Sequence, residues 1–199
     1  MAAPSLEHER TDRADPAHVE AVVTAARAAL ADGTRPPGST VVIAVDGRSG
    51  SGKTLLGTAV AATLGCPVVH LDDVYPGWDG LAEGVALLTA DLLEPVSRGE
   101  AGSYRRWDWM RSRPGRVVPV PASEVLVVEG CGVLVEPAGS HATVRVWVDA
   151  PDEERRRRAL ARDGETYAPH WDRWAAQEEL VYASGPWRGA ALVLGTGTP

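Results

Sequence analysis

The sequence of 199 residues has no phenylalanine and only two cysteines and two methionines. Cys66 and Cys131 lie far apart without metal-ligand spacing, which argues against a disulfide framework and against a zinc site. No apolar run reaches membrane-spanning length, and the opening MAAPSLEHERTDRADP lacks the apolar centre of a secretory signal. We therefore expect a cytoplasmic protein that does not associate with membranes.

Positive charge is also scarce, because 20 Lys and Arg residues face 27 Asp and Glu residues and the formal net charge is -7. Nucleic-acid-binding surfaces usually show as a basic excess, so we expect no nucleic-acid partner. Small anions remain suitable ligands for local basic clusters. The length and the lack of a long linker favour one domain over residues 15–199, preceded by a flexible tail over residues 1–14.

Apolar runs alternate with helical patterns along the rest of the chain. Strands are predicted at residues 41–45, in CPVVH, and at 125–128, 143–148 and 190–194. Helices are predicted at residues 16–32, 53–64, 81–93, 151–162 and 166–183, the first with Asp15 as its cap and Pro16 at its first position. This alternation predicts parallel β-α-β units in a three-layer α/β/α sandwich, with ligands at the carboxyl ends of the strands.

The segment GRSGSGKT joins the first predicted strand to the second helix and matches the phosphate-loop pattern G-x-x-x-x-G-K-[ST]. In such a loop the glycines allow the backbone to curl, and its N–H groups face a phosphate together with the helix N-terminus. Lys53 would reach the outer phosphates and Thr54 would supply an oxygen to Mg²⁺. The predicted nucleotide-binding residues are Gly47, Arg48, Ser49, Gly50, Ser51, Gly52, Lys53 and Thr54.

A phosphate loop by itself does not separate kinases from GTPases, ABC ATPases or motor ATPases. The sequence contains no N-K-x-D motif that would read guanine and no segment like LSGGQ, and it is short for a mechanical ATPase. A small-molecule kinase that uses ATP and Mg²⁺ is therefore the leading interpretation.

Carboxylates close two of the predicted strands, as phosphoryl transfer requires for holding Mg²⁺ and for orienting the accepting hydroxyl. Asp72 and Asp73 follow the second strand, and Glu129 ends the strand VLVV. Any one of them could instead cap a helix or lie solvated in a loop. Three such residues beside a phosphate loop favour a role in the reaction.

The segment DEERRRRALARDGE has acids in its first helical turn and arginines after them, which suits the helix dipole. One interpretation is a solvated helix that pairs its own charges. The other starts from the spacing of Arg155, Arg158 and Arg162, which places them on one face, where their guanidinium groups would close over a triphosphate.

Five segments in order resemble the uridine kinase and phosphoribulokinase branch of P-loop kinases, from about residue 41 to residue 195. They are GRSGSGKT, HLDDVYP, YRRWDW with RSRPGRVVPVPASEVLVVEG, VDAPDEERRRRALARD and RGAALVLGTG. The resemblance implies a P-loop NTPase fold with a five-stranded parallel sheet and a helical lid at about residues 151–166. It also implies transfer of the γ-phosphate of ATP to a hydroxyl group of a small molecule.

The resemblance further implies roles for single residues. Asp72 would lie near the acceptor hydroxyl as base or orienting group, and close to Mg²⁺ together with Thr54 and Glu129. With Asp72, the predicted catalytic residues are Lys53 and the lid arginines Arg158 and Arg162. The predicted acceptor site comprises Asp73, Tyr75, Trp107, Asp108, Arg113 and Tyr167.

The acceptor segment departs from the family pattern, since Trp107-Asp108-Trp109 stands where Tyr-Asp-Phe is usual. We therefore keep three hypotheses: a nucleoside kinase as the first, a kinase for a vitamin riboside, pantothenate-like or secondary-metabolite alcohol, and a regulatory nucleotide-binding protein without turnover. The aromatic residues near residue 170 are interpreted first as packing that helix on the sheet. The alternative is that Tyr167, His170 or Trp171 lines the site when the lid closes. Homo-oligomerisation is left open.

Overall fold

The computed structural model describes residues 13–34, 36 and 38–197, so most of the predicted tail lies outside the described residues. The first described helix, α2 (Pro16–Ala31), confirms the predicted N-terminal signal. The side chain of Asp15 accepts the backbone N–H of Ala17 at 2.8 Å, and Pro16 occupies the first turn, where no helical hydrogen bond needs its missing N–H.

A five-stranded parallel sheet forms the centre of the molecule, as predicted. Its strand order is β2-β5-β1-β6-β7. The strands are β1 (Val41–Asp46), β2 (Val68–His70), β5 (Val125–Glu129), β6 (Val144–Asp149) and β7 (Leu192–Gly195). Because all run in the same direction, their carboxyl ends meet at one edge, where the loops after β1, β2 and β5 lie together.

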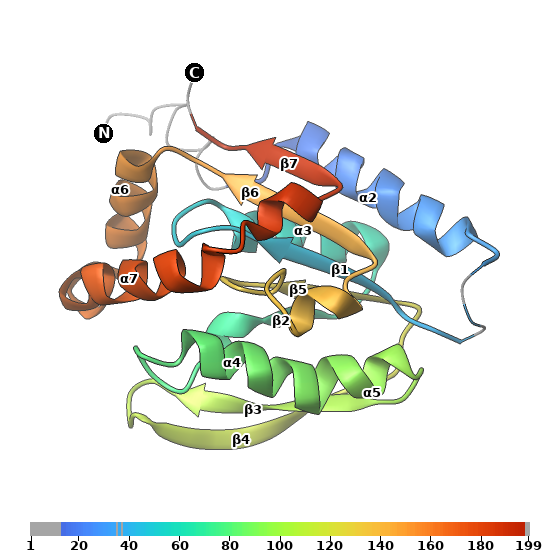
Figure 1. Cartoon of the computed structure of the whole chain (residues 1–199), viewed down its shortest axis with the longest axis horizontal. Coiled ribbons are helices and arrows are strands. Elements are labelled where there is room, and N and C mark those ends of the chain that lie inside the picture. The colour runs from blue at the N-terminus through green and yellow to red at the C-terminus, as the bar shows by residue number, and fades with distance from the viewer. Residues whose placement is uncertain (1–12, 35, 37, 198–199) are drawn as a thin grey trace, which may run out of the picture.

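Both faces of the sheet are buried, which explains the continuous apolar runs of β1 and β5. Val41, Ile43 and Val45 pack in the cluster that includes residues of α2 and of α3 (Lys53–Leu64). Val42 and Ala44 pack in the cluster on the other face. Figure 1 shows α2 and α3 on one side of the sheet and α4 and α5 on the other, which completes the three layers.

The helix predicted to end near Leu93 is longer than expected. It continues from α4 (Leu81–Leu88) through a π-turn (Thr89–Leu93) into α5 (Glu94–Ser97). The N–H of Glu94 reaches back to the carbonyl of Thr89, and this five-residue step widens the turn directly before Pro95. A proline ring would clash with the carbonyl four residues earlier in a regular helix, so the wider turn lets the helix pass Pro95.

The sequence interpretation missed a two-stranded antiparallel hairpin formed by β3 (Gly102–Asp108) and β4 (Arg113–Val120). Its pairing shifts register between Arg105 and Trp107, so strict alternation is lost there. Tyr104 is buried in the core beside the α4–α5 helix. The hairpin lies at the lower edge of the molecule in Figure 1.

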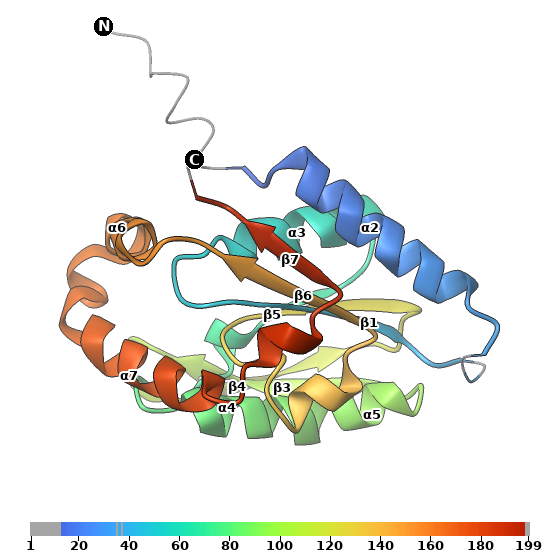
Figure 2. The same cartoon turned by 45° about the horizontal axis from the view of Figure 1, so that its top comes forward.

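The predicted lid and the segment after it lie at the carboxyl edge of the sheet. They comprise α6 (Asp152–Asp163), two short 3₁₀ turns and α7 (Trp171–Tyr182), so the helix predicted to start at residue 166 starts five residues later. Figures 1 and 2 both show α6 and α7 at the end to which the arrows of β6 and β7 point. Within the described ranges, no helix has the length and apolar character needed to cross a membrane.

Candidate active site

The phosphate loop between β1 and α3 adopts a tightly curled backbone that its glycines permit. Gly50 and Gly52 have φ values of 80° and 100°, a region that side-chain-bearing residues rarely adopt. A Cβ on Gly50 would collide with the backbone carbonyl of Arg155, so the loop touches α6 at this point. Lys53 opens α3, is buried, and donates from Nζ to the carbonyl of Arg48 at 3.1 Å, which places its charge over the loop.

Asp46, the last residue of β1, is a fully buried carboxylate that holds the start of the phosphate loop. It accepts the N–H groups of Gly47, Gly132 and Leu134 at 2.7–2.9 Å and the hydroxyl of Tyr182 at 2.6 Å. Burial raises the pKa of Asp46, and these four hydrogen bonds oppose that rise. The sequence analysis did not single out Asp46, because its partners come from segments distant in the chain.

Glu178 on α7 is a second buried carboxylate, 1% exposed, that binds the same loop. Its Oε1 accepts the N–H of Ser49 at 2.6 Å and the indole N–H of Trp174 at 3.1 Å. The guanidinium of Arg155 lies 4.0 Å from its Oε2. α7 therefore helps to set the shape of the phosphate loop, a role that was not predicted from its sequence.

The side chains predicted to act on the metal come from three elements at the carboxyl edge. The Thr54 hydroxyl donates to Oε2 of Glu129 at 3.2 Å, and Nδ1 of His70 lies 2.6 Å from Oε1 of the same residue. Among the residues that the structure describes, no group of three or more His, Cys, Asp or Glu side chains would hold a metal by itself. Mg²⁺ bound to a nucleotide usually takes one or two protein oxygens and keeps phosphate oxygens and waters, so the Thr54 and Glu129 oxygens fit such an ion.

Asp72 lies in a short turn (Leu71–Asp73) directly after β2, with part of its surface exposed and protein atoms packed around its carboxyl group. The surrounding protein raises the pKa of Asp72 by desolvation, and the negative charge of Glu129 raises it further. The positive charges of Lys53 and Arg162 oppose this rise in the Asp72 pKa. A carboxylate with a raised pKa is a better acceptor for a hydroxyl proton.

The three lid arginines do not form one uniform row. Arg155 is buried and donates to the carbonyl of Ser49 at 3.1 Å, so it anchors the backbone of the phosphate loop to α6. Arg158 donates to the backbone and hydroxyl oxygens of Thr196, which in turn donates to the carbonyl of Ser51 at 2.6 Å. The contacts of Arg158 and Arg162 with phosphates stay predictions.

The predicted acceptor residues separate into two environments. Asp73, Trp107 and Asp108 line one groove of about 340 Å³ on the hairpin, whose other lining residues are Arg106, Trp109, Met110, Gly115 and Arg116. Tyr75 is 1% exposed, and its hydroxyl donates to the carbonyl of Cys131, so it lies beneath the site. Arg113 is exposed outside the groove lining.

An aromatic cluster centred on Trp78 joins the hairpin to the segment after the lid. Its ring stacks on Tyr167 at 5.3 Å and on His170 at 4.4 Å, and it lies 4.8 Å from the ring of Trp109. Trp174, further along α7, is buried in the core, in agreement with the packing interpretation of these aromatic residues. Trp78 was overlooked because it lies in the turn-forming segment YPGWDG.

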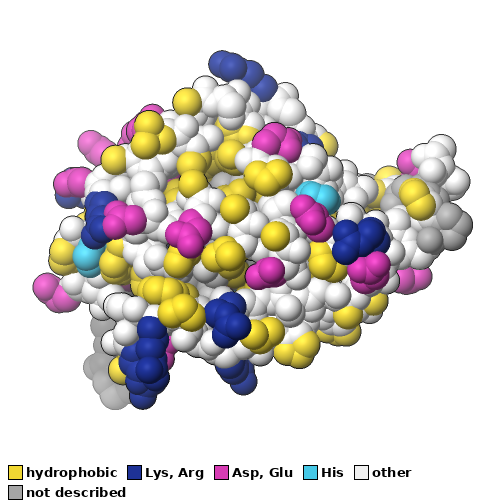
Figure 3. Space-filling view, turned by 60° about the horizontal axis from the view of Figure 1, so that its bottom comes forward, with side chains coloured by type: hydrophobic (Ala, Val, Ile, Leu, Met, Phe, Trp, Pro, Cys, Tyr) yellow, Lys and Arg dark blue, Asp and Glu magenta, His cyan; other side chains and the backbone are white. Residues whose placement is uncertain are grey.

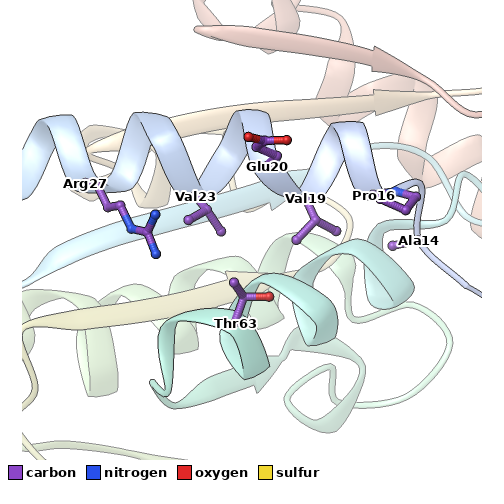
Figure 4. A pocket seen from close by; sticks show the side chains of 7 residues that line it. All are labelled: Ala14, Pro16, Val19, Glu20, Val23, Arg27 and Thr63. Atoms are coloured by element: carbon purple, nitrogen blue, oxygen red, sulfur yellow. The ribbon is translucent and has the colours of Figure 1, made fainter.

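A second hollow lies between α2 and α3 (Figure 4). It is lined by Ala14, Pro16, Val19, Glu20, Val23, Arg27 and Thr63. Thr63 lies ten residues beyond Lys53 along α3, which corresponds to about 15 Å of helix. We therefore assign the chemistry to the carboxyl edge of the sheet, where the phosphate loop and the acidic residues meet.

No protein-family model matches the sequence, and no curated protein matches it. Several solved structures do match it in fold. A protein from Bacillus stearothermophilus described as a possible uridine kinase aligns over 89% of this chain and 97% of its own, with a TM-score of 0.62 and 19% identity. The D-glycerate 3-kinase from Cryptococcus neoformans aligns over 98% and 96%, with a TM-score of 0.58 and 14% identity.

The chain shares the fold of these two structures. This confirms the fold class that the sequence motifs implied, with its five-stranded parallel sheet. A third neighbour, described as a candidate fructose transport system kinase from Silicibacter, aligns over 88% of this chain and 98% of its own, with a TM-score of 0.56 and 21% identity. At these sequence identities the similarity concerns the fold alone. The names of the three neighbours refer to three different compounds, namely uridine, glycerate and fructose.

The contact between His70 and Glu129 predicts a measurable titration. The hydrogen bond to Glu129 raises the pKa of His70 above the usual value of about 6.5. The folded protein then holds this proton more tightly than the unfolded chain does. The protonated His70 therefore contributes fully to the stability of the fold below the His70 pKa of the unfolded chain, and this contribution is lost as the pH rises through the His70 pKa of the folded protein. We expect NMR titration of His70 to give a raised pKa that Glu129→Gln returns toward the usual value. A His70 pKa that Glu129→Gln leaves unchanged would contradict the assignment.

The burial of Glu178 predicts a large loss of stability in Glu178→Ala. The substitution leaves the backbone N–H of Ser49 and the buried indole N–H of Trp174 without their acceptor and removes a buried negative charge beside Arg155, which costs about 3–5 kcal/mol in comparable buried sites. The free energy of unfolding in urea measures this loss. Leu180→Ala serves as the control on the same helix, because Leu180 is 77% exposed and surface changes usually stay within about 0.5 kcal/mol. Equal stabilities of the two variants would show that Glu178 does not hold the loop.

Proposed function

We propose that the protein is a kinase that uses ATP and Mg²⁺ and transfers the γ-phosphate to a hydroxyl group of a small metabolite. The observation that carries this proposal is the meeting of three groups at one edge of the sheet. These are the phosphate loop with Lys53, the acidic side chains of Asp72 and Glu129, and the arginine-rich helix α6. The similarity in fold to proteins described as kinases supports the same reaction class.

The donor half of the site would bind the phosphates of ATP. The N–H groups of the loop and the N-terminus of α3 would face the phosphates, while the Lys53 ammonium would offset their negative charge. Burial opposes the charge on Lys53, but the acidic surroundings that include Glu129 and Asp72 outweigh it and raise the Lys53 pKa. The lysine therefore carries its charge at neutral pH. Mg²⁺, held by Thr54 with Glu129 beside it, would neutralise the developing charge.

The acceptor half would place a hydroxyl group beside Asp72. The hydroxyl oxygen forms a bond to the γ-phosphorus while the bond from that phosphorus to the β–γ bridging oxygen breaks and ADP leaves. Asp72 accepts or orients the hydroxyl proton, and Arg162, which acts electrostatically on Asp72, would stabilise the charge on the transferred group.

Nucleosides are the first acceptor class to test, since Trp107 and Trp109 offer aromatic surfaces that could stack on a base. Non-nucleoside alcohols such as vitamin ribosides or pantothenate-like compounds form the second class, because the same two residues depart from the family pattern. A regulatory nucleotide-binding protein is the third hypothesis. The closely placed Lys53, Asp72 and Glu129 argue against it, because a protein without turnover does not need them together.

Lys53 is the only lysine in the sequence, which gives a specific test of nucleotide binding. An acyl-phosphate derivative of ATP transfers its acyl group to a lysine beside the bound phosphates. We expect mass spectrometry to find the acyl group on Lys53 and to find less of it when excess ATP and Mg²⁺ are present. In Lys53→Arg the signal at this peptide should be absent. Acylation of Lys53 that ATP does not reduce would overturn the assignment of the donor site.

Asp72→Asn tests the acceptor half separately. The variant keeps the size of the side chain but loses the proton-accepting charge, so ADP release with a productive acceptor should fall by about 10²- to 10⁴-fold. ATP protection of Lys53 should persist, since the phosphate loop that would hold the phosphates is unchanged. The assay uses a panel of nucleosides, vitamin ribosides and hydroxy acids. Full turnover by Asp72→Asn with any of these acceptors would show that this carboxylate is not the base or orienting group.

A further inference from the structure

The hairpin beside the active site is strongly basic in a chain whose formal net charge is -7. Between Gly102 and Val120 it contains a single acidic residue, Asp108, and five arginines, namely Arg105, Arg106, Arg111, Arg113 and Arg116. Figure 3 brings the lower side of the molecule forward and shows Lys and Arg side chains gathered at its lower left, next to hydrophobic ones. A basic element in an acidic protein indicates attraction for a negatively charged ligand.

The groove on this hairpin holds hydrogen-bond donors that the protein does not use. Within the described part of the chain, the side chain of Arg116 has no hydrogen bond or ion pair, and the Nε1 of Trp107 is buried without a partner. Arg106 lies in the same groove and is held in place by Asp73 at 2.9 Å. An unpaired buried N–H costs about 1–3 kcal/mol, so the Trp107 indole favours a ligand that supplies an acceptor oxygen.

The groove is connected to the phosphate side of the site through two consecutive residues. Asp72 is influenced by Lys53 and Glu129, whereas Asp73 lines the groove and pairs with Arg106. The indole N–H of Trp109 donates to the carbonyl of Asp72 at 2.9 Å, which fixes the hairpin to this turn. The groove therefore borders the turn that carries Asp72.

We propose that the phosphate acceptor carries an anionic group, a carboxylate or a phosphate, that binds in this groove between Arg106 and Arg116. The Nε1 of Trp107 donates to the same group, and the ring of Trp109 covers the uncharged part of the acceptor. This inference rests on the proposed kinase function and narrows the acceptor class, because a neutral nucleoside would leave Arg116 and the Trp107 N–H without partners.

Matched pairs of acceptors test the proposal in an assay of ADP release. Glycerate with glycerol and pantothenate with pantothenol differ by a carboxylate, while ribose 5-phosphate with ribose differs by a phosphate. We expect the charged member of at least one pair to have a kcat/KM about tenfold or more above that of its neutral partner, as the loss of one charged contact implies. The pair that responds tells a carboxylate acceptor from a phosphate acceptor. The advantage should shrink at high salt, because the groove is open to solvent.

Two variants locate the effect. Arg116→Gln should raise the KM for the charged acceptor about tenfold and leave kcat and the KM for ATP unchanged, because Arg116 holds the acceptor and not the reacting atoms. Trp107→Phe keeps an aromatic ring but removes the N–H donor, and it should raise the same KM by a smaller factor. Arg27→Gln is the control, since it removes an equal charge from an exposed position on α2.

The proposal is overturned if both members of every pair are used equally, if the neutral members are preferred, or if Arg116→Gln behaves like Arg27→Gln. It is also overturned if no member of any pair releases ADP. In each case the ATP protection of Lys53 and the turnover of neutral nucleosides show separately whether the kinase assignment survives.

Discussion

Two buried carboxylates, Asp46 and Glu178, hold the phosphate loop, and the geometry of the site depends on them. Asp46 fixes the first residue of the loop and Glu178 fixes its third, each through a backbone N–H. A buried carboxylate is costly unless its oxygens are satisfied, and here each accepts several hydrogen bonds. The loop is thus shaped before any ligand arrives, which lowers the ordering cost of binding a phosphate.

The same carboxylates bring α7 into the active site without exposing it to substrate. Tyr182 of α7 donates to Asp46, Glu178 of α7 accepts the N–H of Ser49, and the rings of Tyr182 and Trp174 pack in the core. Arg155 then adds α6 to this arrangement by donating to the carbonyl of Ser49. The helices after β6 serve two purposes, since their buried sides support the loop while Arg162 remains at the surface, where it pairs with Asp163.

Local patterns in the sequence predicted the parallel sheet, the phosphate loop and the carboxylates at the strand ends. These features depend on short-range chemistry: β-branched runs, glycines at fixed spacing, and acids directly after strands. The hairpin was missed because the bulge near Arg105 and the prolines of β4 interrupt alternation. Asp46 and Glu178 were missed because the groups they bind lie distant in the chain, as Tyr182 lies 136 residues from Asp46. The row of lid arginines was predicted from helical spacing alone. In the structure these arginines have different partners, because Arg155 binds Ser49 and Arg158 binds Thr196.

Thr196, just beyond β7, links the phosphate loop to helix α6. Its hydroxyl donates to the carbonyl of Ser51 in the phosphate loop, and its oxygens accept from Arg158 on α6. If the lid rotates to bring Arg158 onto a phosphate, that arginine has to leave Thr196 and the loop loses one of its tethers. The position of the lid and the mobility of the phosphate loop are then coupled through Thr196, so a ligand that moves one of them also changes the other.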